Sequence, residues 1–89
     1  MIEQSRIERL GEGSATVGFL FNPMSGRIRK RRDAIRHELT GIPNAVSREA
    51  TSASEINASV DAFLQEDTDL LVVVGGDGTV QAVLNHLFT

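Results

Sequence analysis

The chain alternates between short apolar runs and longer segments in which apolar residues recur at helical spacing. The two clearest runs are ATVGFLF at 15–21 and DLLVVV at 69–74, where every residue after Asp69 is apolar. A weaker run, NAVS, occupies 44–47. Short, continuously apolar runs that are rich in β-branched or aromatic residues are typical of buried strands, so we predict three strands.

Each predicted strand is followed by a segment with the period of an amphipathic helix. The first segment spans 25–41, the second spans 52–66 with Ser52 or Ser54 as its N-cap, and the third begins near Thr79. Their apolar positions are Ile28, Ile35 and Leu39, then Ala53, Ile56, Val60, Phe63 and Leu64, and finally Val80, Val83, Leu84, Leu87 and Phe88. These patterns predict three helices that each bury one face.

The order of strand and helix, repeated three times, indicates a parallel sheet covered by helices on both faces. We therefore predict an α/β fold, a three-layer doubly wound parallel sheet of βαβαβα order with right-handed crossovers. Residues 1–14 are mostly polar and end in GEGS, so we interpret them as an N-terminal extension to a domain at 15–89.

Composition excludes several kinds of site. At 89 residues the chain is one small domain or part of a larger one. Because it has no cysteine, disulfides, thiolate metal sites and cysteine nucleophiles are excluded, and its two histidines, His37 and His86, lack the spacing of a zinc site. No stretch reaches the roughly 18 apolar residues of a membrane span or has the pattern of a signal peptide, so we expect a cytoplasmic protein.

The net charge of −3 conceals a basic segment. Six of the nine basic residues fall within ten positions, namely Arg27, Arg29, Lys30, Arg31, Arg32 and Arg36. Such a segment can attract a phosphate or a lipid headgroup, which would allow peripheral contact with a membrane. Alternatively, it is a solvated helix face with Asp33 and Glu38 as counterions. We do not expect a nucleic-acid partner, because the isoelectric point is near 5.2 and Tyr and Trp are absent.

Two unusual loops follow predicted strands. NPMSG at 22–26 leaves the first strand and GGDGT at 75–79 leaves the third. In a doubly wound sheet, ligands bind outside the carboxyl ends of the strands, where the strand order reverses. We therefore predict that both loops lie at the same edge of the sheet and contribute to one site.

The glycines of GGDGT favour close approach of a ligand to the backbone. Gly75, Gly76 and Gly78 can adopt positive φ and carry no Cβ, and the helix that begins near Thr79 would direct free N–H groups at a phosphate. Asp77 would repel a polyphosphate unless a magnesium ion lies between them or it accepts hydrogen bonds. The alternative for Asp77 is an N-cap without any ligand.

NPMSG offers polar groups of its own. The Asn22 amide and the Ser25 hydroxyl suit a ribose or a phosphate, and Gly26 leaves the following helix N-terminus open. The alternative is a proline-containing turn in which Ser25 only caps the helix.

The segments VGFLFNPMSG and DLLVVVGGDGTVQAVLNHL together resemble the amino-terminal part of the diacylglycerol kinase catalytic domain family, over about residues 16–88. That family also includes sphingosine kinases, ceramide kinases and bacterial lipid kinases. GGDGT alone is shared with NAD kinases, whereas NPxSG selects the lipid kinases. The resemblance implies the fold of the amino-terminal lobe of the NAD kinase and diacylglycerol kinase-like enzymes.

The resemblance implies an enzyme that transfers the γ-phosphoryl group of ATP, with Mg²⁺, to a hydroxyl of a lipid such as diacylglycerol or sphingosine. It makes Asp77 the catalytic residue. A family Thr after the second strand corresponds to Ser47, with Thr51 a less favoured substitute. The nucleotide contacts that it implies are Asn22, Pro23, Met24, Ser25, Gly26, Ser47, Gly75, Gly76, Asp77, Gly78 and Thr79.

The sequence departs from the family in two respects. After GGDGT the family commonly has Leu-Asn-Glu, where this chain has Val80, Gln81 and Ala82. The later nucleotide motif, the general base and the β-rich domain that receives the lipid are expected beyond Thr89. We therefore expect these 89 residues alone to lack lipid kinase activity and to self-associate through residues 70–88. The alternatives are an NAD kinase-like enzyme and a non-catalytic module that binds a nucleotide or polyphosphate.

Overall fold

The computed structural model describes residues 15–88, so the predicted N-terminal extension at 1–14 lies outside the described residues. In chain order the elements are β1 (Val17–Phe21), the 3₁₀ helix η1 (Gly26–Arg31), α2 (Arg32–Thr40), β2 (Ala45–Glu49), α3 (Ala53–Gln65), β3 (Leu70–Val74) and α4 (Asp77–Leu87). The strands form one parallel sheet of order β2-β1-β3. The predicted α/β fold with a parallel sheet is confirmed.

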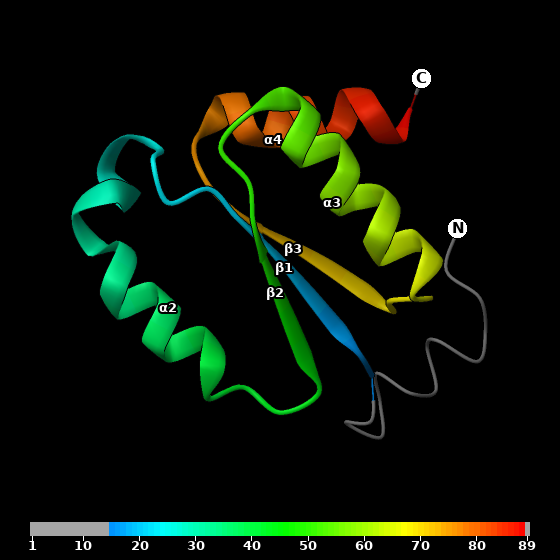
Figure 1. The fold of residues 1–89 in the computed structure, drawn as a ribbon, viewed down its shortest axis with the longest axis horizontal. Coiled ribbons are helices and arrows are strands. Elements are labelled where there is room, and N and C mark those ends of the chain that lie inside the picture. The colour runs from blue at the N-terminus through cyan, green and yellow to red at the C-terminus, as the bar shows by residue number, and fades with distance from the viewer. Residues whose placement is uncertain (1–14, 89) are drawn as a thin grey trace.

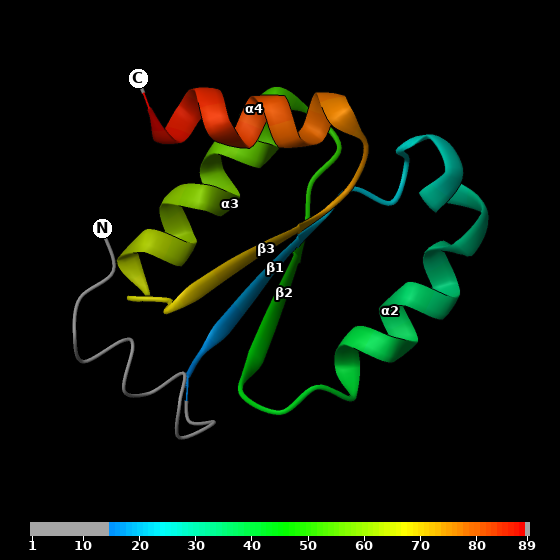
Figure 2. The same cartoon turned by 180° about the vertical axis from the view of Figure 1, so that it is seen from behind.

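The helices cover opposite faces of the sheet. Helix α2 lies on one face, and α3 and α4 lie together on the other, in views from both sides (Figures 1 and 2). Residues of the central strand β1 alternate between the two faces. Leu20 is fully buried in a core cluster with α3 residues such as Val60 and Phe63, while Phe21 is fully buried beside Leu39 of α2. The three predicted layers are therefore present.

Strand β1 carries a glycine where α3 packs most closely. A Cβ atom at Gly18 would lie 2.7 Å from Cδ1 of Phe63, so only a residue without a side chain lets the Phe63 ring rest on the strand. Phe63 also stacks beneath the Arg48 guanidinium of β2, 5.4 Å from the ring centroid. The contacts of Phe63 thus link α3 to β1 and β2.

Strand β2 extends beyond its prediction. We predicted 44–47, but the strand runs from Ala45 to Glu49 because its charged residues have partners on the flanking helices. Arg36 of α2 donates to Glu49 with N–O distances of 2.8 Å, and these hydrogen bonds lower the pKa of the Glu49 carboxyl. Arg48 forms an ion pair with Glu66 at the end of α3. Residues that look too polar for a strand are therefore held in it by tertiary contacts.

The basic segment does not form one continuous α-helix, as the pattern at 25–41 predicted. It begins with the 3₁₀ helix η1 and becomes α-helical only at Arg32. Helix η1 buries no residue and has no side-chain cap, so neither packing nor capping favours the α-helical ladder there. Its cations are therefore arranged around a tight turn.

The topology creates a crevice between β1 and β3. The chain passes from β1 to β2 through α2 on one face, then crosses to β3 on the far side of β1 through α3 on the other face. The connections leaving β1 and β3 consequently diverge to opposite faces at the carboxyl edge of the sheet. This is the switch point at which α/β sheets bind ligands.

Helix α4 and the residue that follows it leave apolar side chains exposed. Val80, Leu84, Leu87 and Phe88 are 39, 45, 40 and 83% exposed. The self-association expected through residues 70–88 stays a prediction, and these exposed side chains are consistent with it. Over residues 15–88, no helix has both the length and the apolar character needed to cross a bilayer.

Candidate functional site

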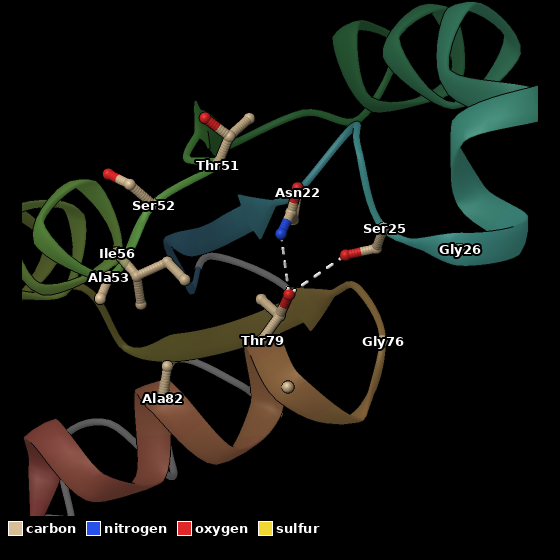
Figure 3. A pocket seen from close by; sticks show the side chains of 11 residues that line it. Asn22, Ser25, Gly26, Thr51, Ser52, Ala53, Ile56, Gly76, Thr79 and Ala82 are labelled. Carbon is tan, nitrogen blue, oxygen red and sulfur yellow. Dashed lines mark hydrogen bonds between the residues drawn. The ribbon is translucent and has the colours of Figure 1, made fainter.

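Hydrogen bonds join the two predicted loops directly. Asn22 donates from its Nδ2 to Oγ1 of Thr79 at 3.0 Å, and the hydroxyls of Ser25 and Thr79 share a hydrogen bond of 3.2 Å (Figure 3). The Asn22 N–H also donates to the Val74 carbonyl at 2.9 Å. Thr79 is only 5% exposed, so its hydroxyl is the buried centre of this junction. The prediction that both loops lie at one edge of the sheet is confirmed.

Gly75 makes room for this junction. A Cβ atom at position 75 would lie 2.8 Å from Cβ of Thr79 and 2.9 Å from both Cγ2 and Oγ1. Among the glycines at 15–88, only Gly26 has a positive φ, of 20°. Gly75, Gly76 and Gly78, which could adopt positive φ, therefore do not use that freedom here. The physical reason for Gly75 is the close approach of Thr79 to the backbone.

NPMSG is a turn fixed by its own asparagine. Oδ1 of Asn22 accepts a hydrogen bond of 3.0 Å from the Met24 N–H, while Pro23 is buried and Met24 is 53% exposed. Ser25 precedes η1 but makes no side-chain hydrogen bond that caps it. The alternative in which Ser25 only caps the helix is therefore wrong, because its hydroxyl contacts Thr79 instead.

A cavity of about 410 Å³ lies between the two loops and the N-terminus of α3 (Figure 3). We call it the inter-loop cavity. Its walls are Asn22, Ser25, Gly26, Thr51, Ser52, Ala53, Ile56, Gly76, Gly78, Thr79 and Ala82. All three segments therefore contribute to one concave surface, although they are far apart in the sequence.

A second hollow of about 470 Å³ also touches Ser25, Gly26 and Gly76. Its other walls are Arg27, Ile28, Gly75 and Asp77. Of the predicted nucleotide contacts, all except Pro23, Met24 and Ser47 line one of these two hollows.

Ser47 lies apart from the other predicted contacts. It is in the middle of β2 and faces a small hollow beside Leu39 and Thr40 of α2. Thr51, the less favoured of the two candidates for the family's Thr, lines the inter-loop cavity. The structure does not bring Ser47 to the site, because β2 continues two residues beyond its predicted end. Only a structure reveals this shift, since the charged residues at 48 and 49 obscure the strand.

The N-termini of α3 and α4 both reach the inter-loop cavity but differ in their hydrogen bonds. Helix α3 has a complete capping box, in which Ser52 accepts from the Glu55 N–H and Glu55 accepts from the Ser52 N–H. Glu55 also accepts from the N–H and hydroxyl of Thr51, and these hydrogen bonds lower its pKa. Helix α3 therefore has a side-chain cap, which accepts the N–H of Glu55.

Helix α4 is uncapped by any side chain, and its N-cap is Gly76. The alternative in which Asp77 is the N-cap is therefore wrong. The N–H groups of Thr79 and Val80 both donate to the Gly76 carbonyl at 3.1 Å, whereas those of Asp77 and Gly78 have no protein acceptor within residues 15–88. Free donors at the positive end of a helix are a ready site for an anion.

The Asp77 carboxylate is exposed at the wall of the second hollow. Within the described part of the chain this carboxylate makes no hydrogen bond or ion pair, so it does not stabilise the fold through a polar contact. No cluster of three or more His, Asp or Glu side chains at 15–88 is arranged to hold a metal ion by itself. A cation at Asp77 would therefore need most of its ligands from a bound molecule and from water.

The buried hydroxyl of Thr79 allows a test of the junction. Replacement by Val keeps the shape but leaves the Asn22 amide and the Ser25 hydroxyl without their partner, so we expect the free energy of unfolding to fall by about 1–3 kcal/mol. Replacement by Ser keeps the hydroxyl and should cost only about 0.8 kcal/mol for the lost methyl group. Urea denaturation of the two variants measures the difference. Equal stability of Thr79→Val and Thr79→Ser would contradict the role of the hydroxyl.

Comparison with known proteins agrees with this geometry. The family model for the diacylglycerol kinase catalytic domain matches residues 16–89. Searches of curated proteins and of solved structures gave no match. The matched region includes the whole sheet, both loops and all the helices, so it is the entire structural unit that matches and not one motif. The chain therefore belongs to the diacylglycerol kinase catalytic domain family, whose members are lipid kinase-like catalytic domains.

Proposed function

We propose that the protein binds ATP with Mg²⁺ between its two loops and, in the full-length enzyme, transfers the γ-phosphoryl group to a hydroxyl of a diacylglycerol- or sphingosine-like lipid. One observation carries the proposal. The hydroxyl of Thr79 joins the two loops, and this junction brings the uncapped N-terminus of α4 and the Asp77 carboxylate to the same crevice. Family membership supports the kinase chemistry.

The start of α4 suits the phosphates of a nucleotide. The N–H groups of Asp77 and Gly78 are without a protein acceptor in the described residues, and the helix dipole favours negative charge there. A Cβ atom at Gly78 would meet nothing within 4 Å, and one at Gly76 would be only 3.8 Å from Cβ of Ser25. These two glycines therefore leave open space beside the donors, which a ligand can approach closely.

The inter-loop cavity suits the rest of the nucleotide. Its volume of about 410 Å³ is within the range of small-molecule sites, and its walls mix hydroxyl groups with apolar side chains. Asn22 uses its Nδ2 on Thr79 and its Oδ1 on Met24, so it mainly positions the junction. Thr51 lines this cavity and Ser47 does not, so Thr51 is the better candidate for a nucleotide contact.

Asp77 fits a role in holding magnesium. Mg²⁺ is commonly bound by one or two carboxylates together with substrate phosphates and water, and a single exposed carboxylate beside a phosphate site meets that need. When bound, Mg²⁺ neutralises charge on the phosphate oxygens. The backbone of α4 would hold the phosphates in place. The oxygen of the lipid hydroxyl would form a bond to the γ-phosphorus as the bond between that phosphorus and the oxygen bridging to the β-phosphate breaks, ADP would leave, and the hydroxyl proton would pass to a general base.

A second function, a non-catalytic nucleotide-binding module, is favoured by one residue. Ala82 is on the wall of the inter-loop cavity, one helical turn from Thr79, at the position where the family commonly has a Glu. A methyl group there cannot bind a cation or exchange a proton. Nucleotide binding without phosphoryl transfer by the full-length protein would support this second function.

Isothermal titration calorimetry with Mg²⁺-ATP tests the proposed site. Gly76→Val should weaken binding by about tenfold or more, because its methyl groups occupy the space beside the free donors. The backbone of Gly76 has φ of −85° and ψ of −177°, which any residue adopts, so the variant should fold. Gly41→Val, at the far end of α2, is the matched control. Unchanged affinity in Gly76→Val, with an intact fold, would rule out the proposed phosphate position.

A further inference from the structure

Another hollow, of about 290 Å³, lies between α3 and α4, and the proposed phosphate contacts do not reach it. We call it the α3–α4 hollow, and its walls are Ala53, Asn57, Ala82, Asn85 and His86. Ala53 and Ala82 are also walls of the inter-loop cavity, where both lie on the side away from Ser25 (Figure 3). The two spaces therefore adjoin at residues that carry only methyl groups, so one ligand can extend from the first space into the second.

Asn57 gives the α3–α4 hollow an amide that the fold does not use. The residue is half-buried, and its side chain makes no hydrogen bond with any residue at 15–88. Its Oδ1 acceptor and its Nδ2 donors are therefore both available. Asn85, in contrast, accepts a hydrogen bond of 3.0 Å at its Oδ1 from Nε2 of Gln81, so it offers the hollow donors only. The Asn57 amide consequently suits a ligand that presents a donor next to an acceptor.

The walls of the α3–α4 hollow offer no uncompensated positive charge. Of the described residues that line it, only His86 is titratable, and its Nε2 is 2.7 Å from Oδ1 of Asp61. That carboxylate would neutralise the charge of a protonated His86 ring. The same contact links α3 to α4 beside the hollow, so it helps to hold the walls in place. A neutral group with hydrogen-bonding edges therefore fits this space better than a phosphate does.

Position along α4 decides which part of a bound molecule reaches the α3–α4 hollow. The free N–H groups of Asp77 and Gly78 mark the phosphate end of the proposed site. Asn85 follows about two turns later, roughly 10 Å from Gly78 along the helix axis. A lipid hydroxyl has to meet the γ-phosphorus beside Asp77, so the hollow is too distant to receive it. A nucleotide with its phosphates at Gly78 that lies along the inter-loop cavity carries its base towards Ala82 and the hollow.

We propose that the α3–α4 hollow is a base-recognition compartment of the nucleotide site, in which Asn57 selects adenine and the small Ala82 side chain keeps the entrance open. The inference rests on the proposed function, because it assigns the base of the proposed nucleotide. Asn57 would donate from Nδ2 to N7 of adenine and accept at Oδ1 from the N6 amino group, the bidentate pair by which asparagine reads this base. Guanine has two acceptors, O6 and N7, at the same edge, so it would leave Oδ1 facing an acceptor.

Calorimetry of the full-length protein with Mg²⁺-ATP, Mg²⁺-GTP and Mg²⁺-tripolyphosphate tests the assignment. We expect ATP to bind about tenfold or more tighter than GTP. Asn57→Ala should bring that ratio close to one and leave tripolyphosphate affinity unchanged, and it should fold because Asn57 makes no polar contact at 15–88 and alanine favours a helix. Gln65→Ala removes an exposed amide from the end of α3, outside the hollow, and is the matched control. Ala82→Leu should weaken ATP about tenfold but not tripolyphosphate, because the larger side chain projects between the two spaces.

The three ligands separate this inference from the phosphate site. A lower ratio of ATP to GTP affinity in Asn57→Ala, with tripolyphosphate bound as by the parent protein, supports base recognition by Asn57. The same ratio in Asn57→Ala and the parent would overturn it, as would equal affinity of the parent for ATP and GTP. Tripolyphosphate bound as tightly as ATP would overturn the base compartment and leave the phosphate position standing. If neither ATP nor tripolyphosphate binds, the proposed function falls and the base compartment falls with it.

Discussion

Replacement of Asp77 by Asn is expected to lower kcat for phosphoryl transfer from ATP to lipid by about 10³-fold in the full-length enzyme. Asn keeps the size of the side chain but removes the negative charge that would hold Mg²⁺ beside the phosphates. The fold should be unaffected, because the Asp77 carboxylate is exposed and makes no hydrogen bond within residues 15–88. Transfer of labelled phosphate from ATP to diacylglycerol or sphingosine in vesicles measures the loss.

A matched control separates this effect from a general change of charge. Glu38→Gln removes an exposed carboxylate on α2, away from both hollows, and should leave kcat unchanged. The thermal midpoint of Asp77→Asn should equal that of the parent protein. Activity of Asp77→Asn within a few-fold of the parent enzyme would contradict a catalytic role for Asp77. A parent enzyme that binds ATP but transfers no phosphate would instead favour the non-catalytic function suggested by Ala82.

The largest effect on stability is expected from Gly75→Ala, which should lower the free energy of unfolding by about 3 kcal/mol. The new Cβ would lie within 2.9 Å of three Thr79 atoms. Thr79 cannot move away freely, because it is in the first turn of α4 and its hydroxyl is bonded to Asn22 and Ser25. Either the junction separates or the β3–α4 connection shifts, and both outcomes should also weaken Mg²⁺-ATP binding.

Gly78→Ala is the matched control for Gly75→Ala, since a Cβ at position 78 meets nothing within 4 Å. Alanine is also a better helix former than glycine, so Gly78→Ala should raise stability by about 0.5–1 kcal/mol. For a domain of this size, the two variants should then differ in Tm by more than about 10 °C. Equal thermal midpoints by circular dichroism would show that the close contact of Gly75 with Thr79 does not constrain the fold.

The GGDGT motif at 75–79 combines residues that support the site with residues that would contact the ligand. Gly75 and Thr79 are needed to join the loops, whereas Gly76, Asp77 and Gly78 face open space at the crevice. Variants of the first pair should therefore affect stability and binding together. Variants of the other three should affect binding or catalysis while the fold persists. A motif of five residues thus contains both the structural support of the site and the groups that would meet the ligand.

The fold class, the strand order along the chain and the position of both loops could be predicted from the sequence. Strands β1 and β3 are short apolar runs that end in turn residues, and a buried parallel strand needs little else to be recognised. Helix α3 is marked by its Ser52 cap and its apolar face. In these segments the local preference and the tertiary environment agree, so the pattern alone determines the structure.

Only the tertiary structure decided which residues meet at the site and why the glycines are there. The last residues of β2 are charged, and they join the strand only because helices on both faces supply their ion-pair partners, which moves Ser47 away from the cavity and Thr51 onto its wall. Gly75 is required by the side chain of Thr79 and not by its own φ, and Asp77 begins the helix without capping it. The sequence shows a residue's neighbours along the chain, whereas each of these features depends on side-chain contacts that exist only once the chain has folded.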